Sequence, residues 1–168
     1  LKRLLINRTA GNPFFLEESV RALVESGVLL GEPGSYTVAK AVSELNVPAT
    51  VESLLASRID RLHPGDKRLL LAAAVIGYHV PLGALEAVAE LTPVALRQAL
   101  ERLQTSEFLH ETSLFPDVEY TFRHALIHDV AYRSVSLDRR RVLHTAALNA
   151  GECLYSDQLL EKSDWLAF

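Results

Sequence analysis

This sequence has a single cysteine, Cys153, and no apolar run long enough to cross a membrane. One cysteine cannot form an internal disulfide, which favours a reducing cytoplasm as the location. The longest apolar run, 69–77, is far shorter than the roughly 20 residues that a bilayer requires. The opening residues LKRLLINR lack the apolar core and cleavage site of a signal peptide. We therefore expect a cytoplasmic protein with no membrane contact.

Positive charge is also scarce. Lysine and arginine number 17 against 21 acidic residues, so the net charge is −4. This balance argues against nucleic acid or an anionic membrane as a partner. The hydrophobic content of 49% is typical of a globular chain. Because helical patterns run up to both ends, we expect the 168 residues to be a fragment of a longer protein.

The motifs of nucleotide hydrolysis and nucleophilic catalysis are missing. There is no G-x-x-x-x-G-K-[ST] loop, and GEPGSY at 31–36 lacks the lysine and the following helix that cradle a triphosphate. There is also no G-x-S-x-G motif, and Cys153 stands in an amphipathic pattern with no sign of activation. We expect this chain to have no enzymatic activity of its own.

The first part of the chain, residues 1–46, contains the stretch AGNPFFLEE. Gly11 tolerates the positive φ that is common just past a helix end. Asn12 is a good N-cap, and Pro13 fits the first position of a new helix. Ordinary helix punctuation is a sufficient explanation of these three residues when they are considered alone.

Two elements are expected after this turn. A helix at 13–26 has Glu17 and Glu18 near its start, where the helix dipole favours acidic side chains. The segment GVLLGEPGSYTV at 27–38 predicts a β-hairpin, because a Gly- and Pro-rich turn separates two apolar runs.

Residues 47–124 carry proline-initiated helical patterns followed by two strand-like pieces, EFLHETS and VEYTFRH. Three helices followed by a β-hairpin is the order of a winged helix-turn-helix. Its expected recognition helix, 92–104, offers Arg97 and Arg102, which Glu101 partly offsets. A DNA-reading helix normally has a basic stripe, so we expect this domain to be structural.

Residues 125–168 contain three consecutive amphipathic patterns: ALIHDVAYRSV, RRRVLHTAALNAGECL and DQLLEKSDWLAF. Successive helices with short breaks are typical of the start of a tetratricopeptide-like α-solenoid. The expected fold of the whole chain is therefore mainly α. It comprises a helical lid, a winged helix with β-hairpins and solenoid helices.

Two groups of polar residues, between positions 124 and 141, could take part in metal or phosphate binding. His124 and His128 are four residues apart and share a helix face, as zinc ligands often do. Ala125 replaces the glutamate of H-E-x-x-H, so we expect interface histidines bonded to backbone or to Asp129, and no metal. The basic run 139–141 is expected to be a solvated face.

Four segments, taken in their order along the chain, indicate more than each segment does alone. GNPFFLEE, VPATVESLLASRIDRL, AAAVIG and YTFRHALIHDVAY together resemble the C-terminal half of the nucleotide-binding module of STAND-type signalling ATPases. The most similar group is the large bacterial predicted ATPases, often fused to class III nucleotidyl cyclase, kinase or DNA-binding domains. The resemblance implies a parent protein that binds ADP or ATP, with Mg²⁺, mainly through an upstream core.

The resemblance also implies site residues. In that family a G-x-P motif lies in the lid and its proline contacts the adenine, which matches Gly11, Asn12 and Pro13. A histidine at the end of the winged helix reaches the β-phosphate of ADP, which matches His124. Ala125 departs from the family motif, because relatives have aspartate there.

The implied function is regulatory: the chain would close over the nucleotide and relay its state to effector or sensor domains. Its partners would be the upstream core, downstream TPR-like repeats and other proteins. Two alternatives are a winged-helix DNA-binding regulator, whose binding would weaken steeply with salt, and a scaffold that binds a protein partner without nucleotide.

Overall fold

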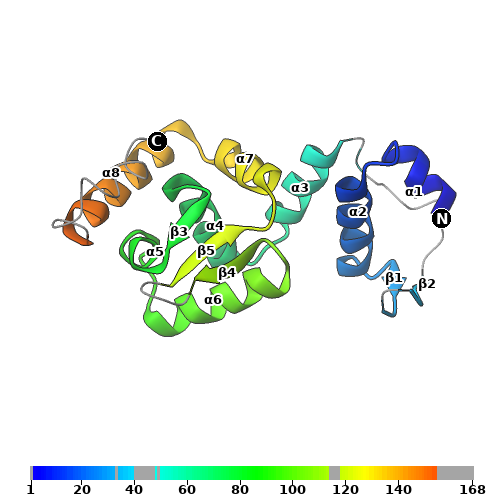
Figure 1. Ribbon diagram of the computed structural model, residues 1–168, viewed down its shortest axis with the longest axis horizontal. Helices are drawn as coiled ribbons and strands as arrows, with labels where there is room; N and C mark the ends of the chain where they lie inside the picture. Colours follow the sequence, from blue (N-terminus) through cyan, green and yellow to red (C-terminus); the bar gives the residue numbers. More distant parts are fainter. Residues whose placement is uncertain (1, 33, 40–47, 49, 114–117, 155–168) are drawn as a thin grey trace. The chain divides into compact units, whose positions relative to one another are not determined.

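The computed structural model describes residues 2–32, 34–39, 48, 50–113 and 118–154 (Figure 1). This described part is mainly helical, with eight helices and five short strands in two antiparallel sheets, which confirms the expected fold class. The chain divides into two compact units, Leu1–Arg61 and Leu62–Phe168. The domain boundaries predicted at 46/47 and 124/125 stay predictions.

The first unit is built around one central helix. Its elements are α1 (Lys2–Arg8), α2 (Pro13–Glu25), β1 (Leu29–Leu30), β2 (Thr37–Val38) and α3 (Val51–Asp60). β1 and β2 pair antiparallel, which confirms the predicted hairpin. α2 packs against α1, β1 and α3, so it is held from several directions.

Two small apolar clusters hold α2 in place. Leu5, Leu23 and Leu29 join it to α1 and β1. Phe15 and Ala22 join it to α3 through Leu54, which is buried. Because different faces of α2 are used in the two clusters, the start of this helix has a defined position within the unit.

The second unit begins with the winged-helix order. Its elements in chain order are α4 (Pro64–Ile76), β3 (His79–Pro81), α5 (Leu82–Ala89), α6 (Pro93–Thr105), β4 (Leu109–Ser113) and β5 (Glu119–Phe122). The three strands form one antiparallel sheet in the order β3-β5-β4. The predicted sequence of three helices followed by a β-hairpin is confirmed, and β3 is an addition.

The sequence pattern did not indicate β3. This strand has only three residues, and it is defined by its pairing with β5, in which Val80 lies opposite Tyr120. Pro81 ends β3 and also stands immediately before α5. A strand this short carries no period of its own, so only its distant partner reveals it.

Helix α4 forms the centre of the second unit. Nearly all of its last eight residues are buried, and it packs against α5, α6, α7 and α8. This burial agrees with its long Leu/Ala/Val run, which is apolar on most sides of the helix.

Two helices follow the sheet: α7 (Ala125–Ser134) and α8 (Leu137–Leu154). α7 packs on α4, and α8 packs on α5 and α4. The third helix predicted in this region, at 157–168, lies outside the described residues, so the solenoid stays a prediction. Among the helices that the structure describes, none combines the length and the apolar character needed to cross a bilayer.

Candidate functional site

The turn before α2 has the backbone that its sequence predicts. α1 ends at Arg8, and Gly11 follows with φ of +74°, while its amide donates to the Ile6 carbonyl at 3.2 Å. Ala10 also has positive φ, at +48°. A left-handed backbone costs a residue with a Cβ about 1–2 kcal/mol, so glycine is the suitable residue at position 11.

Asn12 and Pro13 start α2 as predicted. The Asn12 Oδ1 accepts a hydrogen bond from the Phe15 amide at 3.1 Å, and Pro13 occupies the first helical position. Gly11, Asn12 and Pro13 are all exposed. The apolar ring of Pro13 is therefore accessible at the surface and held in place by α2.

A buried ionic cluster lies further along α2. Arg58 of α3 donates from Nε to Glu25 Oε2 at 3.1 Å and from Nη2 to Glu25 Oε1 at 2.6 Å. Its Nη1 donates to Glu18 Oε2. The Arg58 side chain is fully buried and that of Glu18 nearly so, whereas Glu25 is 37% exposed. This cluster joins α2 to α3 by charge as well as by apolar packing.

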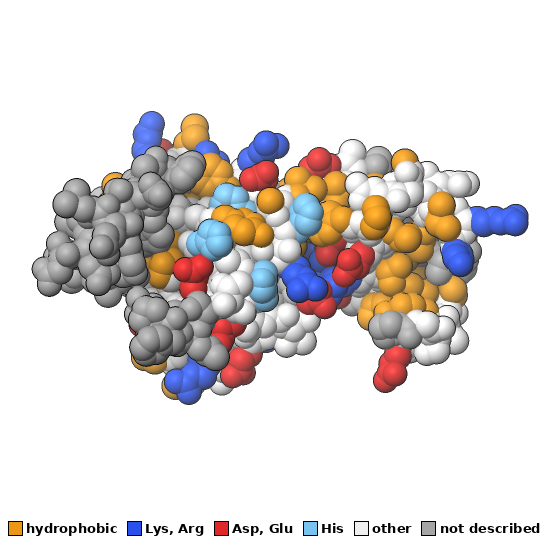
Figure 2. Space-filling model, in the orientation of Figure 1, with side chains coloured by type: hydrophobic (Ala, Val, Ile, Leu, Met, Phe, Trp, Pro, Cys, Tyr) orange, Lys and Arg blue, Asp and Glu red, His pale blue; other side chains and the backbone are white. Residues whose placement is uncertain are grey.

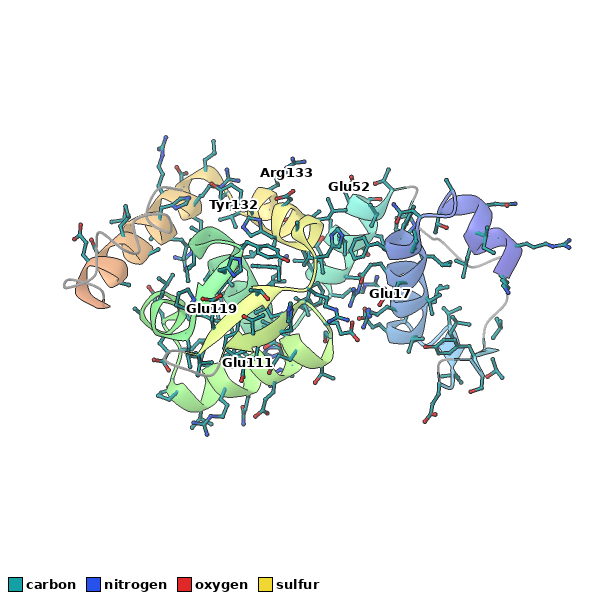
Figure 3. All side chains as sticks on the ribbon, in the orientation of Figure 1. Glu17, Glu52, Glu111, Glu119, Tyr132 and Arg133 are labelled. Atoms are coloured by element: carbon teal, nitrogen blue, oxygen red, sulfur yellow. The ribbon has the colours of Figure 1, made fainter. Side chains whose placement is uncertain are left out.

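The structure corrects the role expected for Glu18. We expected Glu17 and Glu18 to be stabilised by the start of the helix, but neither lies in the first turn of α2. Glu17 pairs with Arg21 at the surface, at 3.2 Å, and is seen on α2 in Figure 3. Glu18 is buried beside Arg58. The sequence signal that could have revealed this is the spacing of Glu18 and Glu25, which places both on the face of Ala22.

Burial changes the acidity of Glu18. Loss of solvent raises the pKa of the Glu18 carboxyl above its ordinary value of 4.5. The positive charge and hydrogen bond of Arg58, with a further contribution from Arg21, lower the pKa but do not cancel the effect of burial. The folded state therefore penalises the ionised form of this carboxyl.

His124 is the N-cap of α7. Its Nδ1 accepts a hydrogen bond from the Leu126 amide at 3.1 Å, and the residue is exposed with an extended backbone. Because Nδ1 acts as an acceptor, the proton of the neutral ring is on Nε2. The cap therefore uses one of the two ring nitrogens of His124 as an acceptor.

His128 is an interface residue, as predicted. Its Nε2 lies 3.1 Å from the Ala74 carbonyl near the end of α4, and its Nδ1 lies 3.3 Å from Asp129 Oδ1. The ring stacks on Tyr132 and meets Phe122 edge-on. Within the described ranges, no group of three or more His, Cys, Asp or Glu side chains has the arrangement of a metal site. Figure 2 shows histidine side chains distributed over this face of the second unit.

One arginine of α6 and one of the basic run make hydrogen bonds within the protein. Arg102 on α6 makes two hydrogen bonds to the buried Asp66 of α4, at 2.7 and 2.8 Å. Arg140 lies over the Tyr132 ring, 4.1 Å from its centre, and donates to the Tyr132 and Val135 carbonyls. Arg139 and Arg141 of the basic run are exposed. Arg140 therefore closes the end of α7, which differs from the solvated face expected for the whole run.

The candidate residues are divided between the two units. The structure brings Gly11, Asn12 and Pro13 together in the first unit, and His124 begins a helix of the second. Compared with known proteins, the chain matches no family model and no curated protein sequence. The residues themselves therefore carry the functional argument.

Proposed function

We propose that this chain is the regulatory lid and winged-helix part of a cytoplasmic STAND-type signalling ATPase. It would contact ADP or ATP that is held, with Mg²⁺, mainly by a core outside this chain. It would then relay the nucleotide state to effector or sensor domains. On this proposal the chain has no ATPase activity of its own, and its partners are proteins rather than nucleic acid or membrane.

One observation carries the proposal: Pro13 is exposed and its position is fixed. The Asn12 cap and the two apolar clusters of α2 hold the ring at the surface. A proline offers a flat apolar surface without a backbone N–H that would need a partner, which suits contact with an adenine. A preorganised contact of this kind costs little entropy on binding.

His124 supplies the second proposed contact. An Nε2–H donor directed at a diphosphate would form a charge-assisted hydrogen bond, which is about twice as strong as a neutral one. The hydrogen bond that His124 Nδ1 accepts from the Leu126 amide fixes the tautomer with the proton on Nε2. Nε2 of His124 is therefore the proposed contact to the phosphate.

The surface of the first unit supports a protein neighbour. Figure 2 shows hydrophobic side chains gathered over this unit. Six large hydrophobic side chains among the described residues of this unit are at least 36% exposed: Leu4, Ile6, Val24, Leu30, Tyr36 and Val38. Apolar side chains grouped in this way are typical of a protein–protein contact, which agrees with packing of a lid on a core.

The test is the nucleotide content of the intact protein, purified without added nucleotide. We expect retained ADP in the wild type and a loss of about tenfold or more in His124→Ala, because one charge-assisted hydrogen bond corresponds to at least that factor. Pro13→Ala should also lose ADP, because it removes the apolar surface proposed to contact the adenine.

The chain offers a matched control for each substitution. Pro93 also occupies the first position of a capped helix and is exposed. His63 caps α4 in the same way as His124 caps α7, accepting from the Gly65 amide at 3.3 Å. Pro93→Ala and His63→Ala should retain ADP. Equal ADP in all five proteins, or equal loss in the controls, would remove the assigned roles.

A further inference from the structure

The contact between α2 and α3 combines a few apolar side chains with an unusual arrangement of charge. Its apolar part consists of Phe15, Ala22 and Leu54, with Val51 packed beside them. Its polar part is one guanidinium, from Arg58, shared by the carboxylates of Glu18 and Glu25. Two carboxylates therefore share one fully buried guanidinium, and Arg21 Nε lies 3.6 Å from Glu18 Oε1 beside them.

We propose that Glu18, Glu25 and Arg58 form a clasp between α2 and α3 that closes with the uptake of a proton and loosens as the pH rises. The proposal does not rest on nucleotide binding, so it can hold or fail independently of the proposed function.

Charge balance explains why a proton favours the closed form. A buried ion is tolerated only when it is paired and hydrogen-bonded. With both carboxylates ionised, the buried Arg58 guanidinium is shared between two negative charges, and Arg21 adds a more distant positive charge beside Glu18. When Glu18 takes up a proton, Arg58 and Glu25 remain as a one-to-one pair with two hydrogen bonds.

The neighbouring charges agree with this assignment. From α2, Arg21 and Glu25 act on the Glu18 carboxyl, with Arg21 Nε 3.6 Å from Glu18 Oε1 and Arg21 also paired to the exposed Glu17. From α3, Arg58 faces it. Among the described residues, both cations that influence the Glu18 pKa favour ionisation, and burial nevertheless raises that pKa. Glu18 is therefore the carboxyl that takes up the proton.

The sign of the pH dependence follows from linkage. With α3 released, Glu18 is in water and its pKa returns to about 4.5. A carboxyl with a higher pKa in the closed form binds its proton more tightly there. Closing is therefore favoured as the pH falls from the raised pKa to about 4.5, and it is independent of pH outside that window.

The position of the clasp gives it a consequence for the chain. Arg58 lies in the last turn of α3, which ends at Asp60, and the second unit begins at Leu62. While the clasp is closed, α3 is part of the first unit. When it opens, the ten residues of α3 are added to the connection between the units. The state of the clasp therefore sets the number of residues in the connection between the two units.

Hydrogen exchange of the full chain, measured from pH 4.5 to 8 and corrected for intrinsic rates, tests the proposal. In the wild type we expect protection of α3 amides to rise as the pH falls, by up to tenfold per pH unit inside the window, because one proton is taken up. Glu18→Gln should abolish this slope, since the amide keeps an acceptor for Arg58 without the titrating group. Protection in α6 should not follow the same slope.

Two further variants make the result decisive. Glu17→Gln changes the adjacent exposed carboxylate and should keep the wild-type slope. Arg58→Met should lower α3 protection at neutral pH, because two carboxylates then lose their cation. A slope that survives in Glu18→Gln, or one that disappears in Glu17→Gln, would overturn the proposal. If Arg58→Met unfolds the first unit, the comparison of Glu18→Gln with Glu17→Gln still tests the proposal.

Discussion

Two histidines begin helices in this chain, in positions where Ser, Thr, Asp and Asn are usual. His63 accepts from the Gly65 amide and His124 from the Leu126 amide, each through Nδ1. An imidazole in this position accepts through Nδ1 and, as the neutral ring, carries its N–H on Nε2. A hydroxyl or carboxylate N-cap also begins a helix, but it has no comparable N–H. At the residue scale, His124 therefore combines a structural and a proposed binding role.

These two roles of His124 can be separated by a single substitution. His124→Ser should keep the cap, so the free energy of unfolding should stay within about 0.5 kcal/mol of the wild type, whereas His124→Ala should lose about 1 kcal/mol. Both variants lack the imidazole donor, so both should lose bound ADP equally. Urea unfolding and nucleotide analysis of the same preparations measure the two effects. Retention of ADP by the serine variant alone would assign His124 to capping only.

At the scale of elements, two arginine–carboxylate contacts join helix pairs, and they differ in solvation. Arg58 is buried between α2 and α3, whereas Arg102 is 51% exposed beside the buried Asp66. Asp66 lies in the first turn of α4, where the helix dipole stabilises a negative charge. Asp66 therefore has a second source of stabilisation, which neither Glu18 nor Glu25 has on α2.

Removal of the two arginines should therefore have unequal effects. Arg58→Met should destabilise the first unit by about 3–5 kcal/mol, because it leaves a buried carboxylate without its cation. Arg102→Gln should destabilise the second unit much less, since water reaches the site and the α4 dipole remains. Urea unfolding followed by circular dichroism measures both variants. Similar losses in the two proteins would contradict this order.

The sequence predicts those elements whose signals are local. Gly11, Asn12 and Pro13 encode a helix end and a helix start within three residues, and the structure has both. The Arg58 contact is of another kind, because its partners lie 33 and 40 residues earlier. No periodicity connects such distant positions. The same reason hides β3, which exists through its pairing with β5.

At the scale of the whole molecule, the two units have separate cores. The first depends on the apolar clusters around α2, and the second on α4 with the helices and sheet that cover it. The proposed nucleotide contacts are divided between these units, Pro13 in one and His124 in the other. A nucleotide that bound both would therefore couple the two units by its own binding energy.

Separate cores predict that the second unit folds alone. A chain that begins at Leu62 contains α4, the three-stranded sheet and all the helices that pack on α4 in the structure. We expect it to unfold in one cooperative transition with helical circular dichroism before the transition. A control chain that begins at Leu82 lacks α4 and β3 and should not fold. Gradual unfolding of the longer chain would contradict the independence of this unit.

The prolines at the helix starts have a consequence for the kinetics of folding. α2, α4 and α6 each begin with proline at the first helical position, so both units contain such a bond. In an unfolded chain, X–Pro bonds exchange between two isomers over tens of seconds, and a folded helix fixes each bond in one of them. Some molecules will therefore wait for an isomerisation before α2 or α4 can dock, and a prolyl isomerase would shorten that delay.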